Sequence, residues 1–171
     1  MYKNVISFVA RGTNSGKTYL MERLIEEMKR RGRKVATLKH TVHPPAVDSE
    51  GKDTDRFIHR GADRVVLFSD QGLILYEAGP IPVEYLYALS SGGMDVVLVE
   101  GFKRGPFKKI EVFNEELYDK PLSLDHPGPD YLAIVSRKPM DVGMPHFCFE
   151  DIGAICTLIE ESAGLSPNPA G

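Results

Sequence analysis

The sequence predicts an α/β fold in which a mostly parallel central sheet lies between two layers of helices. A strand, Val5–Val9, leads through a loop with two glycines into an amphipathic helix. A second strand, 34–38, follows at once, so that strand, helix and strand form one βαβ unit whose two strands are parallel. The near-continuous apolar runs 94–99 and 131–135 are typical of strands buried on both faces.

The loop after the first strand carries residues suited to binding phosphate: Gly12, Thr13, Asn14, Ser15, Gly16, Lys17 and Thr18. Successive backbone N–H groups form an anion-binding nest there, and the positive helix end adds attraction. Lys17 supplies an ammonium for the β- and γ-phosphates, and the Thr18 hydroxyl is placed to ligate Mg²⁺. The usual pattern, G-x-x-x-x-G-K-[ST], has its first glycine at position 11, where this chain has Arg11. We therefore predict a P-loop NTPase-like, three-layer α/β/α fold.

Residue spacing predicts the helix that follows the loop. Its apolar residues recur at intervals of three and four and form one stripe: Leu20, Met21, Leu24, Ile25 and Met28. Lys29, Arg30 and Arg31 fall in the last turn, where cations suit the helix dipole, and Gly32 is the expected C-cap.

A polar segment broken by prolines follows the second strand. In an open α/β sheet, ligands bind at the edge where such segments begin. His40 and His43 could chelate a metal on a helix, but the prolines at 44–45 favour a loop with surface histidines. We predict instead that the Asp48 carboxylate reaches toward Mg²⁺ at Thr18.

Three elements are expected before the next buried strand. A short helix is expected over about 53–60, and the runs 65–68 and 73–76 favour an antiparallel hairpin. Pro82 begins another helix, whose large apolar side chains are expected in the core: Tyr85, Leu86 and Leu89.

The buried strand 94–99 is followed by an acid and a glycine, Glu100 and Gly101. In phosphate-loop proteins a carboxylate in this place holds the Mg²⁺ shell or positions the attacking water. Glu100 fits that role by position, although many strands end in an acid that only starts a surface loop. Lys17 and Glu100 are therefore the candidate catalytic residues.

The rest of the chain adds strands at 110–113 and 131–135 and a last helix from about Asp151. The helix carries a core stripe of Ile152, Ile155 and Ile159, with Gly164 past its end. The segment 136–139 follows a strand at its carboxyl end, where we expect it to contact a nucleotide base.

Length and composition indicate one nucleotide-binding domain over 1–165 and a flexible tail over 166–171. A net charge of −3 and a pI near 6.0 give no basic field that would favour nucleic acid or anionic membranes. No apolar stretch approaches the roughly 20 residues that span a bilayer. Cys148 and Cys156 are not in a C-x-x-C arrangement, so reduced, structural thiols in a cytoplasmic protein are expected.

Five segments occur in one order and spacing along roughly the first two thirds of the chain: 12–18, 38–43, 51–53, 61–62 and 98–103. Together they resemble the molybdopterin-guanine dinucleotide biosynthesis protein B (MobB) family. The resemblance implies a GTP-binding homodimer that is accessory to the guanylyltransferase joining GMP to molybdopterin, with weak GTPase activity. Carried over by position, Gly12 to Thr18 would hold the phosphates, Thr18 and Glu100 would serve Mg²⁺, and Asp48 would be a further member of that shell.

The resemblance leaves the base contact open. Many relatives carry an aspartate suited to guanine where this chain has Arg137, and the chain has no Asn-Lys-x-Asp motif. Guanine preference therefore rests on the resemblance. A basic run would suit molybdopterin, an anionic pterin, although such a run is more commonly a solvated loop: Lys103, Arg104, Lys108 and Lys109.

Two other functions fit the phosphate loop. A small P-loop kinase would pass the γ-phosphate to a small molecule beneath a substrate lid. A metal-delivery GTPase for nickel is suggested by His40 and His43, but such proteins usually add a histidine-rich tract or paired cysteines, which this chain does not have.

Overall fold

The computed structural model describes residues 2–43 and 47–166. The chain divides into two compact units, of which the first comprises Met1–His40 and Tyr87–Gly171 and the second Thr41–Leu86. The domain predicted over 1–165 thus contains two units. The predicted tail, apart from Ser166, and the prolines at 44–45 lie outside the described residues.

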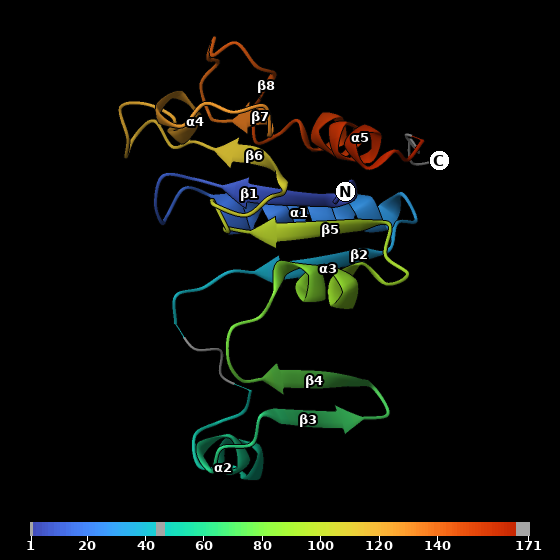
Figure 1. Ribbon diagram of the computed structural model, residues 1–171. Coiled ribbons are helices and arrows are strands. Elements are labelled where there is room, and N and C mark those ends of the chain that lie inside the picture. The colour runs from blue at the N-terminus through green and yellow to red at the C-terminus, as the bar shows by residue number, and fades with distance from the viewer. Residues whose placement is uncertain (1, 44–46, 167–171) are drawn as a thin grey trace. The chain divides into compact units, whose positions relative to one another are not determined.

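The first unit is built on a six-stranded sheet with the order β2-β5-β1-β6-β7-β8. Every neighbouring pair is parallel, and β5 lies between the two strands of the predicted βαβ unit (Figure 1). The strands are β1 Val5–Val9, β2 Val35–Lys39, β5 Val96–Glu100, β6 Lys108–Val112, β7 Tyr131–Val135 and β8 His146–Phe147. The predicted α/β fold with a mostly parallel sheet is confirmed.

Helices α1 (Lys17–Arg30) and α5 (Ile152–Ala163) pack on one face of this sheet. Side chains alternate along a strand, so Ile6 and Phe8 of β1 point to that face together with Ile110 and Val112 of β6. The predicted stripe of α1 is buried there apart from Ile25, which is half-buried, and it meets the isoleucines of α5. This apolar cluster is the core that fixes the beginning of α1 beneath the end of β1.

The short helix α4 (Leu122–Asp125) is held from the opposite face of the sheet. Glu111 alternates with the core residues of β6, and its carboxylate is fully buried. It accepts hydrogen bonds from the backbone N–H groups of Leu122 and Ser123, which begin α4. A buried acid thus satisfies N–H groups that have no partner within the helix.

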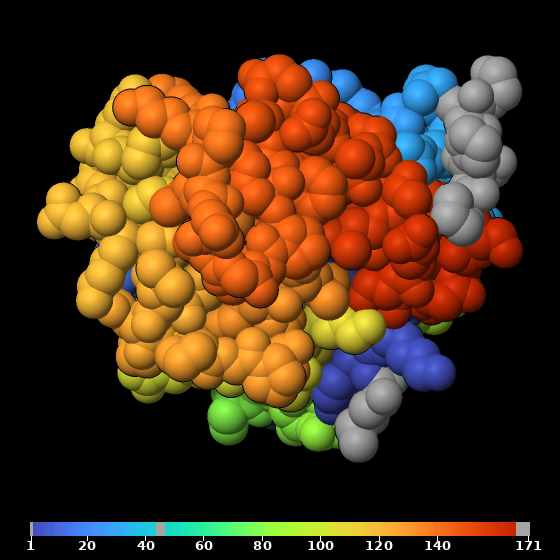
Figure 2. Space-filling model, turned by 90° about the horizontal axis from the view of Figure 1, so that it is seen from above, coloured from blue at the N-terminus to red at the C-terminus, as the bar shows by residue number. Residues whose placement is uncertain are grey.

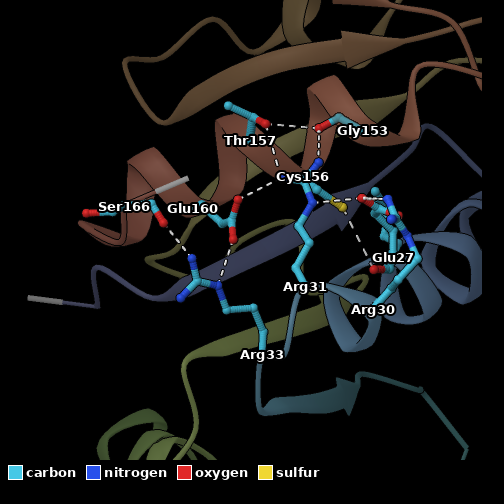
Figure 3. Close-up of polar contacts among 10 residues, drawn as sticks. Glu27, Arg30, Arg31, Arg33, Gly153, Cys156, Thr157, Glu160 and Ser166 are labelled. Atoms are coloured by element: carbon cyan, nitrogen blue, oxygen red, sulfur yellow. Dashed lines mark hydrogen bonds and ion pairs between the residues drawn. The ribbon is translucent and has the colours of Figure 1, made fainter. Parts of the chain in front are cut away.

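The end of α1 is fixed by hydrogen bonds and ion pairs to α5 (Figure 3). Gly32, with φ 75°, follows the C-cap Arg31, and the Arg33 N–H donates to Met28 O at 2.9 Å, which ends the helix in a Schellman motif. Glu160 of α5 is fully buried, and its two carboxylate oxygens lie 2.7 Å from Arg31 and 2.7 Å from Arg33. Arg31 also bonds Glu27, and this contact holds the pKa of Glu27 below its ordinary value.

The second unit contains α2 (Asp53–His59) and the antiparallel hairpin of β3 (Arg64–Ser69) and β4 (Gly72–Glu77). Both are confirmed as predicted. Helix α3 (Val83–Ser91) begins in this unit, and its last turn belongs to the first unit. None of its residues is buried, so the prediction that its large side chains are core residues is wrong.

The edge of the sheet at β8 is the part of the fold with the weakest sequence signal. This strand has two residues, and neither it nor α4 was predicted. Figure 2 shows the face above this edge, where the last third of the chain, coloured orange to red, forms most of the surface. An edge strand this short limits pairing with another strand. Among the helices in the described part of the chain, none has the length and apolar character needed to span a membrane.

Candidate functional site

The loop between β1 and α1 turns through two residues with positive φ. Asn14 has φ 55°, and Gly16, the N-cap of α1, has φ 90°. The Asn114 side chain, which follows β6, donates to the carbonyl of Asn14 at 3.3 Å. The first N–H groups of α1 are therefore presented at the end of the loop, where an anion can accept from them.

Lys17 folds back over the loop that precedes it. Its ammonium lies 3.1 Å from Gly12 O and 2.9 Å from Ser15 Oγ. Burial lowers the pKa of Lys17, and the neighbouring cations Lys103 and Lys39 lower it further, whereas Glu100 acts in the opposite direction. Lys17 thus lies near two other lysines and one carboxylate, and this local excess of positive charge favours an anion.

Thr18 and Glu100, the two residues expected to serve Mg²⁺, lie side by side. The Thr18 hydroxyl donates to Glu100 Oε1 at 3.1 Å, and Lys39 Nζ lies 3.3 Å from the other carboxylate oxygen. Glu100 ends β5, and β5 pairs in parallel with β1, so the carboxyl ends of both strands meet at one edge. The backbone turns there at Gly101, where φ is 87° and the N–H bonds Phe8 O at 2.9 Å.

Arg11, which occupies the position of the usual first glycine, points away from the loop. Its guanidinium bonds the carbonyl oxygen of Lys120 at 3.2 Å and forms an ion pair with Asp125 of α4. Ion pairs with Lys120 and then Arg11 lower the pKa of Asp125 to about 2. The Arg11 carbonyl accepts a bond of 2.7 Å from Lys103. Arg11 therefore anchors the start of the loop to α4.

Gly16 is held close to an aromatic ring. A Cβ at this position would lie 2.9 Å from the ring of Phe149, and its φ of 90° is strained for any other residue. We expect Gly16→Ala to destabilise the fold more than Gly164→Ala, which has a φ of 78° but nothing within 4 Å of its Cβ. Strain alone costs about 1–2 kcal/mol in each case, and only Gly16→Ala also forces Phe149 to move. Urea unfolding of the two variants measures this difference, and equal losses would contradict it.

Two adjoining cavities open around the loop. The first, of about 380 Å³, is lined by the loop from Thr13 to Thr18, by Tyr19 and by Glu100. The second, of about 580 Å³, shares Asn14, Ser15, Gly16 and Tyr19 with the first. Its other walls are two aromatic rings, an amide and two charged groups: Phe113, Phe149, Asn114, Arg137 and Glu150. Arg137, which the sequence placed near a base, is therefore in this cavity.

Asp48 lies in the second unit, where its carboxylate is bound locally. It accepts from Ser49 N at 2.7 Å and from Thr54 Oγ1 at 2.9 Å, and these bonds lower its pKa. Its part in a Mg²⁺ shell stays a prediction.

The two histidines are engaged in different ways. The His40 ring stacks on Phe102 at 5.1 Å between centroids, and the His43 N–H bonds Thr41 Oγ1 at 3.1 Å. Among the residues that the structure describes, no group of three His, Cys, Asp or Glu side chains could hold a metal. Of the two cysteines, both free, Cys156 is buried, and burial raises its pKa to about 12.

The four cations proposed for an anionic pterin do not form one surface. Lys109 is buried and donates to Phe107 O at 2.9 Å, and Lys108 donates to Ser162 Oγ at 2.7 Å. Both start β6, whereas Lys103 follows the carboxyl end of β5 and bonds Arg11 O in the loop between β1 and α1. Arg104 is exposed. The expectation of a four-residue cluster is therefore wrong, because the chain returns across the sheet between 103 and 108.

Several residues at the site carry no sequence motif. Phe149 follows the two-residue strand β8, and Tyr118 lies so close to Gly12 that a Cβ there would overlap its hydroxyl. Asn114 and Lys39 could have been found, because each lies at or just after the carboxyl end of a strand.

Comparison with known proteins places this arrangement in one family. Residues 5–137 match the family described as "MobB: Molybdopterin guanine dinucleotide synthesis protein B". The chain is 35% identical over 153 residues to the molybdopterin-guanine dinucleotide biosynthesis adapter protein of Haemophilus influenzae, covering 86% of this chain and 83% of the relative. It is 30% identical over 164 residues to the probable adapter protein of the same name from Bacillus subtilis, covering 90% of each.

Solved structures agree with these relatives. The crystal structure of Bacillus subtilis MobB superposes with a TM-score of 0.74 at 27% identity, covering 93% of this chain and 97% of the other. A crystal structure of molybdopterin-guanine biosynthesis protein B gives a TM-score of 0.71 at 25% identity, covering 94% and 99%. The family match includes the loop between β1 and α1, Glu100 and Arg137. The chain belongs to the MobB family of molybdopterin guanine dinucleotide synthesis proteins.

Proposed function

We propose that this chain binds GTP with Mg²⁺ at its phosphate loop and acts as an accessory protein in molybdopterin guanine dinucleotide biosynthesis. One observation carries the proposal: the loop, Lys17 and the Thr18–Glu100 pair lie together at one edge of the sheet, in a chain of this family. The relatives are named as adapter proteins of this biosynthesis, which supports an accessory role.

The charge around the loop supports a polyphosphate as the ligand. Lys39 and Lys103 are near enough to Lys17 to lower its pKa. Glu100 is the one acid among the described residues lining the smaller cavity. Among the described residues, the Lys17 ammonium hydrogen-bonds only to Gly12 O and Ser15 Oγ of the loop. Phosphate oxygens would outcompete these neutral acceptors because they carry full charge. The ligand would thus neutralise cations that the fold holds together.

The residues beside the loop fit a magnesium ion. The hydroxyl of Thr18 and the carboxylate of Glu100 are hard oxygen ligands of the kind Mg²⁺ takes, and they lie 3.1 Å apart. Asp48 is proposed as a further member of the shell. When bound, Mg²⁺ would neutralise charge on the β- and γ-phosphates.

Hydrolysis is proposed to be slow. Among the described residues lining the smaller cavity, Glu100 alone could serve as a general base, and it is already bonded to Thr18 and Lys39. Backbone N–H groups and Lys17 would stabilise charge on the γ-phosphate without an activated nucleophile. A partner is therefore expected to complete the site, and a guanylyltransferase that makes the dinucleotide is the partner we propose.

We propose that the chain forms a homodimer whose interface is the hairpin of the second unit. Five large apolar side chains of β3 and β4 are exposed: Val66, Leu67, Phe68, Leu73 and Ile74. Phe68 pairs with Leu73 and is 77% exposed. An isolated two-stranded hairpin is only marginally stable in water, so a second copy covering this surface would stabilise it.

Nucleotide binding tests the proposal. We expect GTP to bind more tightly than ATP, and the presence of Mg²⁺ to raise affinity for the triphosphates more than for the diphosphates. Calorimetric titration of GTP, GDP, ATP and ADP, with Mg²⁺ and with a chelator, measures both effects. Absence of binding by all four nucleotides would reject the proposed function, and tighter binding of ATP with transfer to a small molecule would favour the kinase.

A further inference from the structure

The larger cavity beside the phosphate loop has the size and walls of a nucleoside site. Its volume of about 580 Å³ falls within the range of roughly 300–1,000 Å³ that small-molecule pockets occupy. It shares Asn14, Ser15 and Gly16 with the smaller cavity, so one ligand can extend continuously from one cavity into the other. The base and ribose of a nucleotide whose phosphates lie at the loop would thus reach this cavity.

Aromatic rings line the cavity where a flat base would stack. Phe149 packs against Gly16, and its ring centroid lies 6.4 Å from that of Tyr19, with Phe113 on another wall. Stacking on such rings tolerates every base, because every base has an aromatic face. The rings therefore account for the binding of a nucleoside but give no preference for one base over another.

The charged residues of the larger cavity can distinguish one base from another. Among the described residues that line the cavity, Glu150 is the only carboxylate, and neither a hydrogen bond nor an ion pair of its side chain occurs within the described chain. Arg137, the cation of the same cavity, is already paired with Glu116 at 3.0 Å. Glu150 does not line the smaller cavity, whose lining includes Lys17. If the base of a bound nucleotide lies toward Glu150, its phosphates can lie beside Lys17 in the smaller cavity.

A carboxylate suits guanine and opposes adenine. Guanine presents two adjacent donors, N1–H and the 2-amino group, whereas the corresponding N1 of adenine is an acceptor. An ionised carboxylate only accepts hydrogen bonds, so both of its oxygens are matched by guanine, and adenine would face it with a lone pair. We propose that Glu150 selects the guanine base by accepting hydrogen bonds from N1–H and the 2-amino group. This inference rests on the proposed nucleotide binding at the adjoining loop.

The proposal explains how this chain could recognise guanine with an arginine at position 137. Glu150 lies just before α5, whose N-cap is Asp151, and its neighbour Phe149 is fixed by a bond of 3.1 Å from Arg23 to its carbonyl oxygen. The Asp151 carboxylate in turn accepts from Cys148 N at 2.7 Å. The backbone on both sides of Glu150 is therefore held, and the side chain is presented from a rigid segment of the chain.

The variant Glu150→Gln tests the assignment, because a glutamine amide both donates and accepts. Xanthine keeps N1–H but carries an oxygen in place of the 2-amino group, so it matches glutamine and repels glutamate. We expect Glu150→Gln to weaken GTP binding about 10- to 100-fold and to bind XTP more tightly than the unaltered chain does. ITP, which has no 2-amino group, should bind the unaltered chain more weakly than GTP, because one of the two bonds is missing.

Two controls separate the inference from the proposed function. Inorganic tripolyphosphate probes the loop without a base, and its affinity should be the same in Glu150→Gln as in the unaltered chain. Glu161→Gln changes an exposed acid near the end of α5 and should leave every nucleotide affinity unchanged.

The outcomes are distinct in calorimetric titration. An unaltered chain that binds neither GTP nor tripolyphosphate would reject the proposed function. An unaltered chain that prefers GTP, with a ratio of GTP to XTP affinity that Glu150→Gln leaves unchanged, would overturn the role of Glu150 alone. Equal binding of GTP, ITP and XTP by the unaltered chain would also overturn it, since a donor such as Arg137 would then be reading the O6 edge.

Discussion

Replacing Glu160 by alanine is expected to lower the free energy of unfolding by about 3 kcal/mol. This carboxylate is fully buried between α1 and α5, and its two oxygens are each 2.7 Å from a guanidinium, those of Arg31 and Arg33. Removing one partner of a buried ion pair typically costs about 3–5 kcal/mol, because it leaves charge without compensation. Arg31 keeps its contact with Glu27, at 2.8 Å, which places the expected cost at the lower end of that range.

Urea unfolding followed by circular dichroism measures this loss. Glu161→Ala is the matched control, because it removes the adjacent but exposed acid of the same helix and should change stability by no more than about 0.5 kcal/mol. Glu160→Gln keeps the shape of the side chain and should lie between the two. Equal stabilities of Glu160→Ala and Glu161→Ala would show that the ion-pair cluster does not hold α1 to α5.

Replacing Lys17 by alanine is expected to weaken GTP binding about 10- to 100-fold, the usual value of a charged hydrogen bond. The fold should persist because, within the part of the chain that the structure describes, the ammonium hydrogen-bonds only to Gly12 O and Ser15 Oγ of its own loop. Calorimetric titration gives the affinity, and a thermal melt of the free protein checks that it is folded. Any stimulation of a guanylyltransferase that depends on bound GTP should fall with the affinity.

Lys3→Ala supplies the control for this experiment. Lys3 is exposed and precedes the amino end of β1, at the edge of the sheet opposite to the phosphate loop. Its removal changes net charge by the same amount as Lys17→Ala and should leave GTP affinity unchanged. Equal affinities in the two variants would exclude Lys17 from the binding of phosphate.

Elements with strong local patterns could be predicted from the sequence. The strands Val5–Val9 and Tyr131–Val135 begin and end at the predicted residues, since each is a short apolar run between polar segments. The pairing of Thr18 with Glu100 was also predictable in outline, because both residues follow or end strands of one parallel sheet. The prediction of a four-cation surface is wrong. Lys108 and Lys109 are close to Lys103 in sequence, but they begin β6, whereas Lys103 follows the carboxyl end of β5, at the opposite edge of the sheet.

The sequence by itself determined the strand β1, the helix α1 that follows its loop, and the parallel strands, because local periodicity and glycine placement specify these features with few alternatives. Only the tertiary structure decided that Arg11 anchors the loop to α4, that Glu111 and Glu160 are buried acids, and that Glu150 lines a cavity beside Gly16. Each of these depends on contacts between residues far apart in the chain. Burial and charge pairing are set by what the fold brings next to a side chain, which local sequence does not record.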